Sequence, residues 1–194
     1  MSTELIKQVS AGTDDGYISS AGSFNNTNAY LVFGRYESYT KAFARLLNIT
    51  IPHGATIDSA VISVAAYATD SATPVYTRIH FNDIDDVTAT PTSAAEYNAL
   101  DLTTAYVDWS MPAFSQYTWY DSPDIKTVLQ EIIDRDGWES GNDIMLMILD
   151  NGSAAYHMKQ PYTYDGDSGG GLKLTINYTV PVAGHFMTTN RGCW

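Results

Sequence analysis

Side chains that commonly perform catalysis are few in this sequence and stand far apart. None of the histidines belongs to a metal or nucleophile motif such as H-E-x-x-H or G-x-S-x-G. They lie in four separate segments, at His53, His80, His157 and His185. Two carboxylates for glycoside cleavage could be chosen from the 22 acidic residues, but that mechanism depends on their separation, which a sequence does not give. We therefore predict that the protein is not an enzyme.

Acidic residues gather in two short segments that could bind calcium. Calcium takes oxygen ligands that converge on one point, and carboxylates at short spacing supply them. The candidate ligands are Asp83, Asp85, Asp86, Asp165 and Asp167. The alternative is that these residues form turns by accepting hydrogen bonds from their own backbone. No EF-hand spacing is present, and calcium is the only cofactor that the sequence suggests.

Aromatic residues could form a surface for sugar. An aromatic ring covers the apolar face of a pyranose while nearby polar groups bind its hydroxyls. The candidate glycan contacts are Tyr117, Trp119, Tyr120, Tyr162 and Tyr164. The alternative is that such rings pack between sheets, and we predict a core position for Trp109 and Trp138.

Charge and composition exclude several classes of partner. The 194 residues carry a net charge of −12, which repels phosphate backbones and argues against nucleic acid and anionic membranes. No apolar run is long enough to span a bilayer, and the first residues do not read as a signal peptide. The single Cys193 cannot form an internal disulfide or complete a usual zinc site.

One segment has the pattern of an amphipathic helix, over about residues 123–135. Ser122 is suited to the N-cap and Pro123 to the first helical position. Apolar residues then recur on one helical face until Gly137, at Ile125, Val128, Leu129, Ile132 and Ile133. Residues 143–150 follow as an apolar run that is short enough to be a buried strand.

The rest of the chain reads as short strands between turn-forming residues. Residues 75–81 alternate, which places Val75 and Ile79 on one face and Tyr76 and Arg78 on the other. Residues 83–104 read as a surface excursion with one short helical turn. Other strands are expected at about 4–9, 15–19, 29–35, 41–50, 57–68 and 106–109, with 154–159 and 172–178 as a closing pair.

These elements predict an all-β fold. About nine antiparallel strands imply two packed sheets, a jelly-roll-like sandwich with the one amphipathic helix (about 123–135) covering an open end of its core. We expect one domain over residues 1–179 and an extended C-terminal tail over 180–194.

The tail is a candidate interaction segment. It carries large apolar side chains without a core of its own, at Phe186, Met187 and Trp194. These rings could anchor the tail on a neighbouring subunit and so support a homo-oligomer. The alternative is a frayed terminus.

Several short motifs resemble one known family. Residues 14–17 read DDGY, 44–46 read ARL, and 50–60 read TIPHGATIDSA. Residues 103–109 read TTAYVDW, 122–125 read SPDI, and 136–138 read DGW. Together they resemble DNRLRE-type β-sandwich domains, which open with a strand, the pattern I-P-x-G-A-T-I-x-S-A and a second strand. The resemblance spans residues 10–179.

The resemblance implies a function without catalysis. Such domains are similar to parts of bacterial surface proteins and phage virion proteins that serve in display, adhesion or carbohydrate contact. We therefore predict a phage virion structural protein, a capsid decoration (cement) protein or a head or tail fibre subunit. It would be made in the host cytoplasm, lie in the virion and contact other virion proteins. The alternative is a carbohydrate-binding or adhesion module for host glycans.

Overall fold

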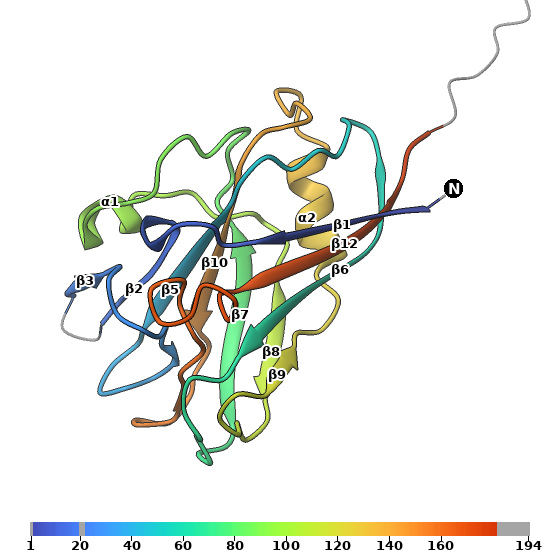
Figure 1. Cartoon of the computed structure of the whole chain (residues 1–194). Helices are drawn as coiled ribbons and strands as arrows, with labels where there is room; N and C mark the ends of the chain where they lie inside the picture. Colours follow the sequence, from blue (N-terminus) through green and yellow to red (C-terminus); the bar gives the residue numbers. More distant parts are fainter. Residues whose placement is uncertain (1, 20–21, 182–194) are drawn as a thin grey trace, which may run out of the picture.

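Two antiparallel β-sheets packed face to face form the protein (Figure 1). The structure is a computed structural model and describes residues 2–19 and 22–181. Side chains from the facing strands of both sheets share one buried core, which includes Ile62 and Ile176 from one sheet and Ile79 and Leu146 from the other. The predicted all-β sandwich is confirmed.

The smaller sheet brings the first and last strands together. Its strands, in spatial order, are β1 (Ser2–Gln8), β12 (Lys173–Thr179), β6 (Thr56–Ala65) and β9 (Trp119–Asp121). β1 and β12 pair along their whole length, with Ser2 opposite Thr179 and Gln8 opposite Lys173. β1 lies at the edge of this sheet. The chain therefore enters and leaves the sandwich at one place.

The larger sheet has the predicted apolar strand at its centre. In spatial order it contains β3 (Phe24–Asn25), β2 (Asp15–Ile18), β5 (Lys41–Leu46), β10 (Ile144–Asp150), β7 (Val75–Phe81) and β8 (Val107–Met111). The alternation predicted for β7 is confirmed, because Val75 and Ile79 are buried whereas Tyr76 is exposed. Trp109 and Trp138 are also buried, as predicted.

A two-stranded sheet, β4 (Phe33–Gly34) with β11 (Met158–Lys159), closes one end of the sandwich. Gly34 has a φ of 92°. A side chain there would collide with Val75 and with the backbone of His157, so only glycine allows this close approach. Isolated bridges between Tyr30 and Tyr162 and between Ala66 and Pro161 extend the contact at the same end.

The amphipathic helix is present but begins later than predicted. Helix α2 covers Lys126–Ile133 and buries four apolar residues, Val128, Leu129, Ile132 and Ile133. The prediction of Ser122 as the N-cap is wrong. The hydroxyl of Ser122 accepts a hydrogen bond from the backbone of Ile62, and it is Asp124 that accepts one from the Lys126 N–H. Ser122 therefore accepts a hydrogen bond from a backbone N–H of the neighbouring strand β6 and does not cap the helix.

Two shorter helical segments lie in the connections. The helical turn predicted between residues 83 and 104 is α1 (Ala94–Asn98), and a 3-10 turn precedes β2 at Gly12–Asp14. Tyr97 of α1 packs with Phe43 and Met147 in a second, smaller apolar cluster. No helix in the described residues is long and apolar enough to cross a membrane.

Two strand predictions are wrong. Residues 29–35 form only the two-residue strand β4, and residues 154–159 form only β11. The predicted closing pair does not exist, because β12 pairs with β1 and β6 whereas β11 pairs with β4. Which strands pair depends on segments that are far apart in the sequence, and the alternation within one segment does not reveal that pairing. The anchors predicted in the tail, Phe186, Met187 and Trp194, lie outside the described residues.

Candidate functional site, a tyrosine-lined end of the sandwich

Two of the predicted glycan contacts meet at the end of the sandwich that β4 and β11 close. The rings of Tyr117 and Tyr162 are stacked, with centroids 6.4 Å apart and planes inclined by 23°. Tyr162 also packs edge-on against Tyr67 at 5.2 Å. Tyr67 in turn contacts Tyr30 at 5.0 Å, and Tyr30 stacks on Tyr17 at 6.4 Å. These five rings, Tyr117, Tyr162, Tyr67, Tyr30 and Tyr17, form a continuous series that we call the tyrosine row.

Backbone hydrogen bonds between distant segments hold the tyrosine row in place. The Tyr162 N–H donates to the Ala65 carbonyl at 2.9 Å, and the Tyr117 N–H donates to the Ala66 carbonyl at 2.8 Å. The Tyr67 N–H donates to the Gln160 carbonyl at 2.8 Å. Backbone hydrogen bonds thus position three of the five rings, in addition to the contacts between the rings.

The inner end of the row opens into a small cavity of about 260 Å³. Its lining has no charged side chain and consists of Tyr17, Ser19, Tyr30, Val32, Tyr36, Thr40, Met158 and Gln160. Pockets for drug-sized ligands measure roughly 300–1,000 Å³. This cavity, which we call the row cavity, therefore suits a ligand of about one sugar ring.

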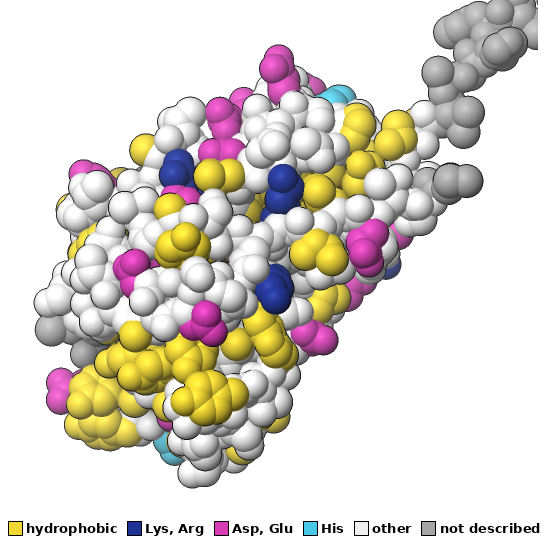
Figure 2. Space-filling model, in the orientation of Figure 1, with side chains coloured by type: hydrophobic (Ala, Val, Ile, Leu, Met, Phe, Trp, Pro, Cys, Tyr) yellow, Lys and Arg dark blue, Asp and Glu magenta, His cyan; other side chains and the backbone are white. Residues whose placement is uncertain are grey.

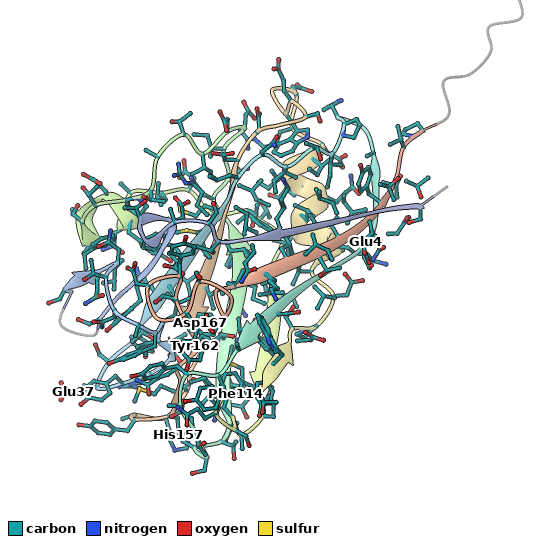
Figure 3. All side chains as sticks on the ribbon, in the orientation of Figure 1. Glu4, Glu37, Phe114, His157, Tyr162 and Asp167 are labelled. Carbon is teal, nitrogen blue, oxygen red and sulfur yellow. The ribbon has the colours of Figure 1, made fainter. Side chains whose placement is uncertain are left out.

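More tyrosines contact Tyr36, which lines the row cavity, or lie near it in the chain. Tyr36 and Tyr156 meet edge to face at 5.4 Å, and the guanidinium of Arg35 lies 4.9 Å from the centre of the Tyr39 ring. Tyr36, Tyr39 and Tyr156 are exposed. Figure 2 shows apolar side chains gathered at the lower left of the molecule, the end at which Figure 3 labels Glu37, Tyr162 and His157. Exposed apolar patches of this kind mark binding surfaces.

Two of the exposed tyrosines have an unfavourable backbone conformation. Tyr117 and Tyr156 both have a φ of 64°, in the left-handed region that costs a residue with a side chain roughly 1–2 kcal/mol. Their side chains are 72% and 59% exposed, so burial does not offset this cost. Strained positions of this kind cluster at functional sites.

Two hydroxyls of the row, those of Tyr17 and Tyr162, have a raised pKa and keep their protons at neutral pH. Burial raises the pKa of Tyr17, and the nearby Tyr30 raises it further. Burial also raises the pKa of Tyr162, to which Tyr117 and Asp167 contribute. Figure 3 shows Tyr162 beside Asp167. A neutral phenol both donates and accepts hydrogen bonds, which is what a sugar hydroxyl requires.

The other three predicted glycan contacts do not join the row in the described part of the chain. The Trp119 ring is exposed, but the Lys173 ammonium lies 4.0 Å from its centre. Tyr120 stacks on the buried Phe114 ring at 4.2 Å. Tyr164 is half-buried against the main core.

Four of the five candidate calcium ligands are bonded to protein partners. Asp83 and Asp85 both form ion pairs with Arg135, and Asp86 accepts a hydrogen bond from the Asp143 N–H. Asp167 accepts one from the Gly169 N–H, while Asp165 is exposed and lies against Gly12. Among residues 2–19 and 22–181, no three His, Cys, Asp or Glu side chains come together in a group that could hold a metal ion. The calcium prediction therefore finds no site there.

One buried carboxylate lies beside the row. Asp15 is fully buried next to Tyr17, and its Oδ2 accepts a hydrogen bond from the Tyr164 N–H at 2.9 Å. Its Oδ1 has no partner. Burial raises the pKa of Asp15 to about 7, and the nearby Asp165 and Asp14 raise it as well. Asp14 itself is paired with Arg45.

Two of the histidines lie against backbone carbonyls in different parts of the fold, and His185 lies outside the described residues. The His80 ring lies 2.9 Å from the Thr103 carbonyl, and burial lowers its pKa. The His157 ring lies 3.2 Å from the Pro74 carbonyl. Neither hydrogen bond joins the ring to a nucleophile or a carboxylate that would make it a catalytic pair.

Sequence reasoning missed three members of the row and the lining of its cavity. Tyr17, Tyr30 and Tyr67 are separated by more than ten residues each along the chain, so no spacing connects them. The only signal available was the abundance of tyrosine, 14 residues. No model of a known protein family matches the sequence, and no curated protein matches it either.

Proposed function

We propose that this protein is a non-catalytic carbohydrate-binding β-sandwich and that the tyrosine row is its contact surface for a glycan. The observation that carries the proposal is the continuity of the row. It leads from Tyr117, which is 72% exposed, to an uncharged cavity of sugar size. Successive rings of a glycan could therefore contact successive tyrosines.

Tyrosine suits this task for physical reasons. Its ring offers a large, flat apolar face with few rotatable bonds, so little conformational entropy is lost on binding. Its hydroxyl bonds the sugar hydroxyls that surround the apolar face of a pyranose. Because backbone hydrogen bonds fix Tyr67, Tyr117 and Tyr162, the surface is formed before the ligand arrives.

Binding without cleavage agrees with the lining of the row cavity. Glycoside hydrolysis generally requires two carboxyl groups that flank the scissile bond. The row cavity is lined by hydroxyl, amide, thioether and aliphatic groups and by no Asp or Glu. A sugar held there would meet hydrogen-bond partners but no acid and nucleophile pair.

A glycan array probed with the full chain tests the proposal. We expect binding to neutral oligosaccharides that falls at least about tenfold in Tyr117→Ala and in Tyr162→Ala, since stacked aromatic anchors dominate such interfaces. Tyr76→Ala is the matched control, because Tyr76 is 40% exposed and lies outside the row. No oligosaccharide binding, or equal losses in all three variants, would contradict the proposal.

A role as a phage virion structural protein is a second proposal, and the open edge of β1 supports it. β1 pairs on one side only, with β12, and Ile6 on this strand is 55% exposed. An unpaired edge strand is a template for pairing with another chain. β12 ends at Thr179, which lies opposite Ser2 of this edge strand.

Light scattering tests the assembly part of that second proposal. The full chain should form a closed oligomer, and a version that ends at Thr179 should dissociate if the tail supplies the anchors. Monomers at all concentrations for the full chain would argue against self-assembly. They would leave the carbohydrate proposal unaffected, since a binding module functions as a monomer.

A further inference from the structure

We propose that the row cavity is a subsite for one neutral N-acetylhexosamine residue, held at the end of a glycan. The inference rests on the proposed carbohydrate function and specifies its ligand. The neighbouring sugars of the glycan would continue outward along Tyr67, Tyr162 and Tyr117. Three properties of the lining lead to this choice: its unpaired polar groups, its apolar wall and its lack of charge.

The polar groups of the row cavity are available to a ligand. The described residues provide no hydrogen-bond partner for the hydroxyls of Tyr30 and Tyr36 or for the side-chain amide of Gln160, whose backbone alone is bonded. Thr40, in contrast, already donates to the carbonyl of Gly34. An amide side chain both donates and accepts, so Gln160 can bind the N–H and the C=O of an acetamido group together.

An apolar wall lies in the same cavity. Val32 is 6% exposed, and Met158 on β11 is half-buried against the main core. A thioether side chain adapts its shape to small apolar groups. The acetyl methyl group is the one apolar substituent that distinguishes an N-acetylhexosamine from a hexose. Val32 and Met158 therefore offer it a contact that a plain hydroxyl would not use.

The lack of charge excludes related sugars. No Lys or Arg lines the row cavity to pair with the carboxylate of a sialic or uronic acid, and no Asp or Glu lines it to pair with the ammonium of a free hexosamine. The net charge of −12 further disfavours acidic sugars. A sugar that is neutral and acetylated fits both restrictions.

Saturation-transfer difference NMR on the full chain tests the subsite. The probes are the methyl glycosides of N-acetylglucosamine, N-acetylgalactosamine, glucose and galactose, together with N-acetylneuraminic acid. We expect at least one N-acetylhexosamine to bind about tenfold more tightly than its parent hexose, since a site built to bond a polar group rejects the analogue that lacks it. Its acetyl methyl group should show the strongest saturation, and N-acetylneuraminic acid should not compete.

Two variants locate the binding within the molecule. Gln160→Met keeps the length of the side chain and should reduce the preference for the acetylated sugar to about twofold or less. Tyr36→Phe removes only a hydroxyl from a side chain that is 46% exposed, and it should weaken monosaccharide binding even if Gln160→Met does not fold. Tyr76→Ala, at an exposed tyrosine outside the row, should leave monosaccharide affinity unchanged.

The failures of the two proposals are distinguishable. Equal affinity for hexoses and N-acetylhexosamines, or a preference that survives Gln160→Met, overturns the subsite but leaves the carbohydrate function standing. Oligosaccharide binding that depends on Tyr117 without any monosaccharide binding also overturns the subsite. Absence of binding to every sugar, short or long, overturns both.

Discussion

Protonation of Asp15 is linked to folding because this carboxyl group is buried. Its pKa is raised to about 7 in the folded protein from an ordinary value of 3.8, chiefly by burial. Between these values the folded chain keeps a proton that the unfolded chain has lost. The stability that this gives is fully present below pH 3.8 and is lost as the pH rises through 7.

Replacing Asp15 should make stability less dependent on pH. We expect the free energy of unfolding of the natural chain to fall between pH 4 and pH 8 by about 4 kcal/mol more than that of Asp15→Asn, as a shift of this size implies. Urea titrations at several pH values measure the difference. Asp136→Asn, at an exposed carboxylate, is the matched control. Parallel stability curves for all three proteins would show that Asp15 does not titrate in this way.

The strained backbone at Tyr117 leads to a second prediction. Glycine adopts a φ of 64° without steric cost, so Tyr117→Gly should not lower the free energy of unfolding and could raise it by about 1 kcal/mol. The same change should abolish binding of longer glycans. Tyr76→Gly, in the extended strand β7, should instead lose about 1 kcal/mol. A loss at Tyr117 as large as that at Tyr76 would contradict the prediction.

The members of the candidate site differed in how far the sequence revealed them. Tyr117 and Tyr162 were predicted because each stands close to other aromatic residues in the sequence. Tyr30 could not be predicted, since the rings that it contacts, Tyr17 and Tyr67, belong to β2 and to the residues after β6. These contacts exist only once the strands have paired, and a single sequence does not contain the pairing.

Helix α2 connects the sheets through two polar side chains. Gln130 donates to the Ala55 carbonyl at 3.0 Å and accepts from the Ile57 N–H at 2.7 Å. Glu131 accepts from the backbone N–H groups of Thr104 and Ala105, each at 2.7 Å. The helix thus fixes the start of β6 and the segment that leads into β8, besides covering the core.

Removing one of these side chains should destabilise the fold without changing its core. Gln130→Ala leaves a half-buried N–H and C=O without partners, so we expect a loss of about 1–3 kcal/mol in the free energy of unfolding. Thr127→Ala, on the exposed side of α2, should change it by less than about 0.5 kcal/mol. Chemical denaturation compares the two, and equal effects would show that Gln130 does not hold β6.

Strands whose own sequence has a clear apolar pattern were predictable. Strands that form only because another segment pairs with them were not. β7 alternates and β10 is continuously apolar, so each indicates its own burial. β4 and β11 contain two residues each, and they exist because Gly34 lets the backbones approach. The start of α2 was misplaced for a similar reason, since Ser122 bonds to β6 in place of the helix.

The two ends of the sandwich are separated by the length of β12. This strand begins at Lys173, close to the loop that carries Asp167 beside Tyr162, and ends at Thr179 opposite Ser2. Seven residues of strand extend about 20 Å. Figure 1 shows the start of β1 and the end of β12 at the upper right, whereas Figure 3 labels Tyr162 below and to the left of them. Immobilising the protein by a tag at either terminus should therefore give the same glycan affinity, which biolayer interferometry can check.

This separation gives the domain a polarity. A support joined to the chain at Ser2 or beyond Thr179 would lie at the end of the sandwich away from the tyrosine row. The stacked rings would then face away from that support. Copies placed side by side on a surface would all point their tyrosines toward the medium, so weak contacts with single sugars would add up to firm attachment on a densely glycosylated target.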